Sequence, residues 1–364
     1  MAKAKPDFFR KLLSNIKDDQ SSIAADGESS AEYTGYVDTG CYALNALLSG
    51  SVHGGIPNNK VVAFAGESAV GKTFFIMGIV KHFLDANTTA GVVYYDTEAA
   101  VTKDMMEARG IDTNRVIISE PLSIQQFRTH ALQVLEEYMK SDEKDRPPLM
   151  MALDSLGALS TDKEIKDTAE GKDTRDMTRA QLIRATMRVL RLKLAKAKVP
   201  MLVTNHVYAA VGAYVPTSVM SGGGGLRYAS DDIIMLSKSK DKEGTQVVGG
   251  IIRAKTYKSR NARENQEVQV KLSYATGLDR YYGLLAIAER AGVLRKDGVK
   301  FALPDGRKVY GKEINDSPAE VFDPIMDKIE EAAGKLFKYG TGFDEAEPRL
   351  VDGVLADGNG EVVD

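Results

Sequence analysis

The chain has a single cysteine, Cys41, in 364 residues. One cysteine excludes an internal disulfide and fits a protein that works in a reducing compartment. Histidine is scarce too, because the chain has only four, and they are scattered rather than spaced as zinc ligands. We therefore expect neither a disulfide framework nor a zinc site.

Long apolar runs are also missing. The start, MAKAKPDFFRKLL, has no apolar stretch long enough for a signal peptide, and no segment reaches the ~18 apolar residues that a membrane helix needs. Strong charge of one sign is missing as well, since the formal net charge is -3. The sequence predicts a soluble cytoplasmic protein with no membrane partner, on which any nucleic-acid surface is local.

Apolar runs and helical stretches alternate from Tyr33 onward. The candidate strands are Val61–Ala65, Gly91–Tyr95, Leu149–Leu153, Pro200–Thr204, Ile233–Leu236, Gly249–Ala254 and Val268–Tyr274. Continuous apolar runs joined by helices are typical of a mainly parallel sheet covered on both faces. The later runs follow each other closely, which indicates antiparallel strands added at one edge. The predicted fold class is therefore α/β.

We divide the chain into four parts: residues 1–32 (an N-terminal helix and linker), 33–285 (the α/β core), 286–342 (a small C-terminal α/β domain) and 343–364 (an acidic tail). The small domain is expected to contain a hairpin around Asp305 and Gly306 and a helix from Pro318 to Phe337. Seven acids against Arg349 predict that the tail is disordered. It either solubilises the protein or mimics DNA at the protein's own basic site.

The N-terminal helix is amphipathic. Its apolar stripe consists of Phe8, Phe9, Leu12, Leu13 and Ile16. The polar stretch from Asp18 to Glu32 separates this helix from the core and reads as a linker. An apolar stripe on a detached helix needs a surface to cover it. That surface belongs either to the same domain or to a neighbouring subunit.

A phosphate-binding motif follows the first long strand. Val61–Ala65 leads into GESAVGKT and then a helical stretch, which matches G-x-x-x-x-G-K-[ST] between strand and helix. Backbone N–H groups and the helix N-terminus would hold the phosphates of ATP. Lys72 would reach the β- and γ-phosphates, and the Thr73 hydroxyl would bind Mg²⁺. The predicted nucleotide-binding residues are Gly66, Glu67, Ser68, Ala69, Val70, Gly71, Lys72, Thr73 and Phe74.

Two carboxylates follow other strands of the same sheet. Asp154 ends LMMALD and has the form of the acid that holds Mg²⁺ through water. Glu98 follows Gly91–Tyr95 and is placed to deprotonate an attacking water. A helix N-cap acid is the alternative interpretation of Glu98. Because ligands bind beyond the carboxyl ends of parallel strands, we expect Lys72, Glu98 and Asp154 to converge.

Two segments have the character of ligand surface rather than core. The charged stretch Thr161–Arg175 leads into a basic helix, and Val207–Tyr228 is long for a loop and contains four consecutive glycines. Aromatic rings there can stack on bases while backbone N–H groups hold phosphates. A solvated helix face is the alternative for the basic residues. The candidate DNA-binding residues are Arg175, Arg179, Arg188, Tyr208, Gly222, Gly223, Gly224 and Arg227.

His206 lies between the predicted strand Pro200–Thr204 and the long loop. Most isolated histidines are simply satisfied polar groups. Its expected position at a strand end facing the phosphates favours a sensor of the γ-phosphate that passes its state to the loop.

The motifs GESAVGKT, YYDTE, LMMALDS, MLVTNH and SGGGG occur in the order seen in the RecA family. The chain resembles this family over roughly Tyr33 to Tyr310. DMTRAQ, TNH and LDRYYGLL make it most similar to the phage UvsX recombinases. The resemblance implies a RecA-like core, ATP bound between subunits, and a filament on single-stranded DNA. That filament would pair the strand with homologous duplex DNA in the host cytoplasm, helped by a mediator and a single-strand-binding protein.

The resemblance also assigns roles to individual residues. Lys258 and Arg260 match two basic residues that reach ATP across the subunit interface, where a solvated strand end is the alternative. Tyr274 matches an aromatic ring that packs on adenine, and His206 stands where bacterial members have glutamine. The helix Phe8–Ile16 resembles the arm that family members lay on the next subunit, which favours the intersubunit interpretation. The glycine-rich loop is slightly shorter than in bacterial members.

Other functions remain possible from the residues alone. A ring helicase would use the same core, but no extra helicase domain is evident. An ATP-dependent switch would bind nucleotide without DNA-stimulated hydrolysis. A small-molecule kinase would need a lid and an acceptor pocket that the sequence does not reveal.

Overall fold

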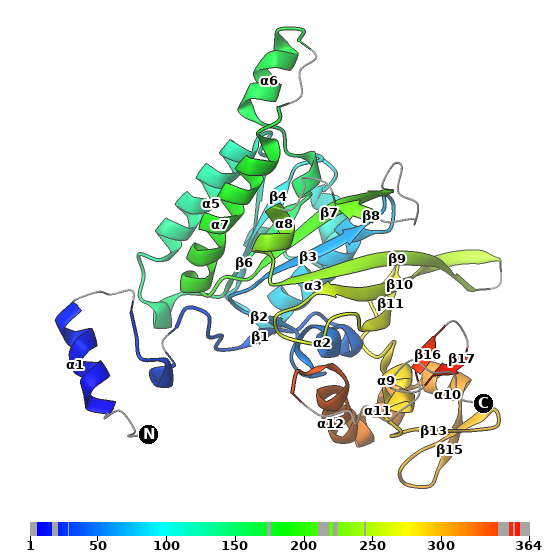
Figure 1. Ribbon diagram of the computed structural model, residues 1–364. Helices are drawn as coiled ribbons and strands as arrows, with labels where there is room; N and C mark the ends of the chain where they lie inside the picture. The colour runs from blue at the N-terminus through cyan, green and yellow to red at the C-terminus, as the bar shows by residue number, and fades with distance from the viewer. Residues whose placement is uncertain are drawn as a thin grey trace.

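The computed structural model describes residues 6–16, 21–27, 29–172, 176–209, 218–220, 225–243, 245–340, 349–351 and 354–356. A large twisted sheet with helices on both faces forms its centre (Figure 1). The predicted α/β class is confirmed. None of the helices in these ranges has the length and apolar character needed to cross a bilayer.

The central sheet has ten strands in the order β12-β11-β10-β9-β3-β7-β6-β4-β5, with β8 paired to β7. The strands are β3 (Val61–Gly66), β4 (Gly91–Asp96), β5 (Val116–Ser119), β6 (Leu149–Asp154), β7 (Met201–Ala209), β8 (Ser218–Met220), β9 (Asp232–Glu243), β10 (Gln246–Lys258), β11 (Glu267–Ser273) and β12 (Gly277–Leu278). Strands β9, β3, β7, β6, β4 and β5 run parallel. Strands β10, β11 and β12 add antiparallel at one edge, as predicted.

Alternate residues of the central strands enter two separate apolar clusters. In β3, Val62 and Phe64 face the cluster that contains α2 (Tyr42–Ser49) and α3 (Lys72–Ala86). Val61 and Ala63 face the cluster of α5 (Ile124–Tyr138) and α7 (Arg179–Ala197). Because side chains alternate across a strand, burial on both faces requires a continuous apolar run. This requirement explains why the central strands stand out in the sequence.

The N-terminal helix α1 (Pro6–Ile16) lies apart from the sheet (Figure 1). An ion pair of 2.6 Å between Arg10 and Asp26, in the short helix η1 (Ala24–Asp26), holds it to the linker. The apolar stripe stays open, since Phe8 is 63% and Ile16 is 55% exposed. The described residues of the same chain therefore do not cover it.

Short elements connect the core. They are β1 (Tyr36–Val37), β2 (Ile56–Pro57), α4 (Lys103–Glu107), η2 (Thr113–Arg115), η3 (Glu143–Asp145), η4 (Leu156–Ala158), α6 (Asp162–Ala169) and α8 (Gly225–Ala229). Helix α6 occupies much of the predicted charged stretch Thr161–Arg175 and projects from the body (Figure 1). Thr161 caps it, and Glu164 completes a capping box, which explains why so polar a segment is helical.

The C-terminal part begins with α9 (Leu284–Arg290) and a small sheet of β13 (Arg295–Asp297), β14 (Lys300–Ala302) and β15 (Lys308–Tyr310), followed by α10 (Gly311–Asp316). The predicted helix Pro318–Phe337 is wrong as one helix. It is divided into α11 (Pro318–Phe322), η5 (Asp323–Ile325) and α12 (Met326–Phe337), because Pro324 cannot donate a helical hydrogen bond.

The acidic tail contains one described pair, β16 (Arg349–Val351) with β17 (Val354–Ala356), which the prediction of disorder did not include. The other tail residues lie outside the described ranges. Apolar side chains from Leu294 to Phe337 join the same cluster as α2 and α3. The domain boundary at residue 286 stays a prediction.

This shared cluster predicts how the chain unfolds. Phe337 is 1% exposed, so Phe337→Ala should lower the free energy of unfolding by ~3–5 kcal/mol. The loss should appear in the main transition that also unfolds the sheet, measured by chemical denaturation with circular dichroism. Val299→Ala, at a side chain that is 78% exposed, is the control and should change stability by less than ~0.5 kcal/mol. A separate early transition of the C-terminal part alone would contradict the shared core.

Candidate nucleotide-binding site and the family it belongs to

The loop between β3 and α3 has the backbone that a phosphate cradle needs. Gly71 has a φ of 98°, a backbone conformation that residues with a side chain rarely adopt. A Cβ on Gly66 would lie 2.7 Å from the carbonyl oxygen of Leu236, so only glycine fits there. Lys72 Nζ donates to the carbonyl oxygens of Gly66 at 3.0 Å and Glu67 at 2.9 Å. The lysine is thereby held over the loop.

A cavity of about 390 Å³ opens on this loop. Its phosphate end is lined by Ser68, Ala69, Gly71, Lys72, Thr73, Glu98, Asp154 and His206, and its other end by Phe74, Met77, Arg109 and Tyr274–Leu278 among others. The strand register explains the convergence. Gly66 is paired with His206, and Asp96 with Asp154, so these strands reach the same edge of the sheet. Gly66, Glu67 and Val70 shape the loop without lining this cavity.

Glu98 is the centre of a polar chain at the phosphate end. Its Oε1 accepts from Ser155 Oγ at 2.6 Å and lies 3.0 Å from His206 Nε2. His206 Nδ1 lies 3.4 Å from Lys72 Nζ. The histidine tautomer with its proton on Nε2 satisfies both contacts. His206 is inside β7 rather than after a strand end, because β7 continues to Ala209.

These contacts keep Glu98 ionised. Burial raises the pKa of Glu98, but hydrogen bonds from Ser155 and His206 and the charge of Lys72 bring it below its usual value overall. Burial also lowers the pKa of Lys72, while Glu98 and Asp154 oppose that shift. A carboxylate that is charged at neutral pH is able to accept a proton.

Asp154 is fixed by two hydroxyl groups. Its Oδ2 accepts from Tyr94 at 2.9 Å, and its Oδ1 accepts from Thr204. The carboxylate is 5% exposed and still lines the cavity. Magnesium prefers carboxylate and hydroxyl oxygens and usually keeps several waters and substrate phosphates as ligands. Thr73 and Asp154 fit that donor set.

A metal site formed by protein side chains alone would need several ligands close together. Within the described ranges, no group of three or more acidic, histidine or cysteine side chains could hold a metal ion. Thr73 and Asp154 would hold Mg²⁺ together with the phosphates, Thr73 directly and Asp154 through water.

The far end of the cavity is aromatic and cationic. The Arg109 guanidinium lies 4.2 Å from the ring centre of Phe74. Tyr274 is 58% exposed, and Lys238 Nζ lies 5.8 Å from its ring centre. Planar groups of this kind can stack on a base.

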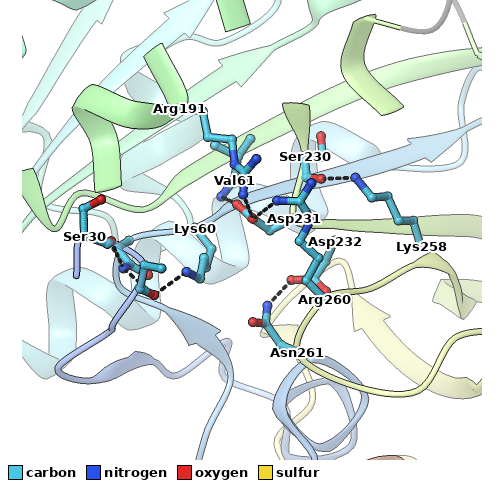
Figure 2. Close-up of polar contacts among 12 residues, drawn as sticks. Ser30, Lys60, Val61, Arg191, Ser230, Asp231, Asp232, Lys258, Arg260 and Asn261 are labelled. Atoms are coloured by element: carbon cyan, nitrogen blue, oxygen red, sulfur yellow. Dashed lines mark hydrogen bonds and ion pairs between the residues drawn. The ribbon is translucent and has the colours of Figure 1, made fainter. Parts of the chain in front are cut away.

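Lys258 and Arg260 lie at the opposite edge of the sheet, where β10 ends (Figure 2). Lys258 Nζ donates to the carbonyl oxygens of Arg227 at 2.7 Å and Ser230 at 2.6 Å. Through Ile233 of β9, Lys258 is level with Ala63 of β3, three residue steps or about 10 Å from Gly66 at ~3.3 Å per residue, and strand β9 also lies between β10 and β3. Arg260 lies further away, beside Asp231, which binds Val61 at the amino end of β3, five residue steps or about 17 Å from Gly66. The two cations are therefore too far away to reach the phosphate loop of their own chain.

The candidate DNA-binding residues have different surroundings. Arg179 donates to the carbonyl oxygens of Leu159 at 3.0 Å and Gly157 at 2.8 Å, so it braces its own chain. Arg188 is exposed on α7, and Tyr208 is 61% exposed on β7. Arg227 lies 5.4 Å from the ring centre of Tyr257. Arg175, Gly222, Gly223 and Gly224 lie outside the described residues.

A model of the RecA N-terminal domain matches residues 11–279. The chain belongs to the RecA family. The recombination and repair protein of Enterobacteria phage T4 is 28% identical over 253 residues, covering 70% of this chain and 63% of the phage protein. A RecA protein of Thermus thermophilus is 28% identical over 330 residues, covering 88% of this chain and 92% of that protein. The predicted family and the likeness to a phage recombinase are both confirmed.

Several residues of this RecA-family site were missed from sequence. Ser155 directly follows Asp154, and its position after a strand end is the signal that was available. Thr204 stands inside a recognised motif but received no role of its own, and Arg109 was not singled out. Their partners Glu98, Asp154 and Phe74 lie 30 to 60 positions away in the chain, and spacing patterns do not reveal such contacts.

The hydrogen bond from Ser155 to Glu98 predicts a measurable change in the pKa of Glu98. Ser155→Ala should raise the pKa of Glu98, because a donor to the charged form is lost. Because the pKa of Glu98 is lower in the folded than in the unfolded protein, Glu98 stabilises the folded state at pH values above the pKa of a free glutamate. This stabilisation is lost as the pH falls through the pKa of Glu98 in the folded protein. In Ser155→Ala, the loss of this stabilisation should begin at a higher pH. Carboxyl carbon NMR of labelled glutamate measures the shift. Ser239→Ala, on β9, is the control, and an unchanged Glu98 pKa in Ser155→Ala would contradict the assignment.

Proposed function

We propose that this chain is an ATP-dependent DNA recombinase that assembles on single-stranded DNA and pairs it with homologous duplex DNA in recombination and repair. Family membership and the names of the relatives, a recombination and repair protein and RecA, support this function. The observation that supports it is the separation of two sets of residues at opposite ends of the sheet strands. Lys72, Glu98 and Asp154 line one edge, and Lys258 and Arg260 lie at the other.

The hydrolysis step follows from the geometry at the phosphate end. Glu98 accepts a proton from the attacking water, and Lys72 holds the β- and γ-phosphates. Bound Mg²⁺ would neutralise charge on the phosphates between Thr73 and Asp154. Phe74, Arg109 and Tyr274 would hold the base. Lys258 and Arg260 of the next subunit would stabilise the transferring phosphoryl group, as an arginine finger does.

Strand β7 joins the nucleotide to the DNA. His206 contacts Glu98, and Tyr208 stands two residues further along the same strand, so both side chains lie on the same face. The next residues up to Tyr228 form the segment proposed to bind DNA. A change in the γ-phosphate that moves His206 would thus move the DNA-binding segment as well. We propose that ATP orders this segment on single strands and that hydrolysis releases it.

The proposal extends to partners. The DNA is held mainly through its backbone, while base pairing supplies sequence specificity. A mediator and a single-strand-binding protein would control access to the strand. The exposed stripe of α1 would lie on the neighbouring subunit in the filament. The protein would act in the cytoplasm where its DNA is.

The first test removes the proposed base. Glu98→Gln keeps the shape and the hydrogen bonds of the side chain but cannot take a proton. Hydrolysis of ATP on single-stranded DNA should slow by ~10²–10⁴ while binding of ATP and DNA is kept. Phosphate release measures the rate. Glu120→Gln, at an exposed acid that follows β5, is the control and should hydrolyse ATP normally. A Glu98→Gln variant with normal hydrolysis would show that Glu98 is not the base.

The second test measures the coupling. Affinity for a fluorescent single strand should be higher with a slowly hydrolysed ATP analogue than with ADP or without nucleotide, and it should fall steeply with salt. Electron microscopy of the same mixtures should show filaments only with the analogue. Equal affinity in all three states would overturn the recombinase proposal. Directional unwinding of duplex DNA without homology would instead indicate a helicase.

A further inference from the structure

Asp231 is a buried carboxylate at the edge where Lys258 and Arg260 lie (Figure 2). It is 1% exposed and directly precedes β9. Its Oδ2 accepts from the backbone N–H of Val61 at 3.0 Å. Its Oδ1 accepts from Arg191 of α7 at 2.8 Å and lies 3.5 Å from Nη1 of Arg260. One carboxylate thus faces two arginines, and only one of them is proposed to reach the neighbouring subunit.

The two arginines do not bind Asp231 equally. Charge-assisted hydrogen bonds are strongest at 2.7–2.9 Å, and 3.5 Å is the outer limit of a bond. Arg191 therefore makes the strong bond, and Arg260 makes only a weak contact. The side chain of Arg260 remains 43% exposed, whereas that of Arg191 is 34% exposed. Arg260 is the cation left free to turn outward.

The next carboxylate does not compete for these cations. Asp232 accepts from Asn261 at 2.7 Å and from Ser259 at 2.5 Å. Its burial raises its pKa to about 6, even though these bonds lower it. Lys60 donates to the carbonyl oxygen of Ala31, and Lys258 donates to backbone carbonyls. Asp231 is therefore the carboxylate whose charge acts directly on Arg260.

We propose that Arg191 is a positioning residue for hydrolysis across the subunit interface. Arg191 neutralises the charge of Asp231 and so leaves Arg260 available to the phosphates that the neighbouring subunit binds. The idea rests on the proposed function, since it needs Arg260 to serve a second subunit. A buried carboxylate without a partner is costly. Without Arg191, Asp231 would draw Arg260 in from 3.5 Å and withhold it from the interface.

The main experiment removes the charge of Arg191 from the full-length protein. Arg191→Met keeps a long side chain on the helix. We expect kcat for ATP hydrolysis on single-stranded DNA to fall about tenfold or more, with KM little changed. A complete loss of an arginine finger costs ~10³–10⁵ in kcat, and this variant would lose part of that contribution. Arg191→Lys should recover most of the rate because it returns the charge. Lys196→Met, at an exposed site on the same helix, is the control and should keep the normal rate.

The second variant separates positioning from direct contact. Arg191→Met combined with Asp231→Asn should recover kcat, because an uncharged side chain no longer captures Arg260. The amide oxygen can still accept from Val61. A double variant as slow as Arg260→Ala would overturn the proposal, since Arg191 would then itself be needed by the phosphates. Should Arg191→Met not fold, as thermal melting would show, the neutral double variant alone decides between these outcomes.

A mixing experiment tests the interface directly. Glu98→Gln subunits keep Arg191 and Arg260, while Arg191→Met subunits keep Glu98 and Lys72. Mixed filaments should therefore hydrolyse ATP faster than either variant alone. No gain on mixing would overturn the proposal. If Arg260→Ala hydrolyses ATP normally, the proposed cross-subunit site itself is wrong, which is a different result from a failed rescue in the double variant.

Discussion

The length of strand β3 is the constraint on which the site depends. Its carboxyl end leads into the phosphate loop, and at its amino end the backbone N–H of Val61 donates a hydrogen bond to Asp231. About 17 Å of extended chain lies between them, which no side chain spans. Lys258 and Arg260, as proposed, would therefore serve only a nucleotide that another molecule binds. In the proposed recombinase, assembly and hydrolysis are consequently a single event, because neither chain holds a whole site.

The same sheet connects the nucleotide-binding site with the segment proposed to bind DNA. Strand β7 is paired with β3 and β6 along its buried half, then continues beyond the phosphate edge and pairs with β8. His206 lies at the point where buried strand becomes projecting strand. A stiff paired strand transmits a small displacement better than a loop would. This stiffness is a physical reason why the residue that contacts Glu98, His206, is part of β7.

The sequence predicts what depends on local pattern. The phosphate loop, Glu98 and Asp154 follow buried strands, and burial on both faces makes those strands apolar and recognisable. The predicted end of β7 lies five residues too early, because Thr204, Asn205 and His206 interrupt the apolar run although pairing to neighbouring strands continues. Arg191 has the pattern of a solvated helix face. Nothing in its spacing reveals a carboxylate 40 positions later.

In the proposed mechanism, that distant contact keeps a catalytic charge available to the neighbouring subunit. An arginine that works across an interface has to be attracted to phosphate more than to its own chain, yet it must be held near the place where the phosphate arrives. A nearby carboxylate alone would hold it too strongly, since a buried charge without its own partner is costly. Asp231, which is shared with Arg191, contacts Arg260 only weakly and leaves it near the amino end of the strands. The hydrogen bond that the backbone N–H of Val61 donates to Asp231 links this carboxylate to the strand that carries the phosphate loop.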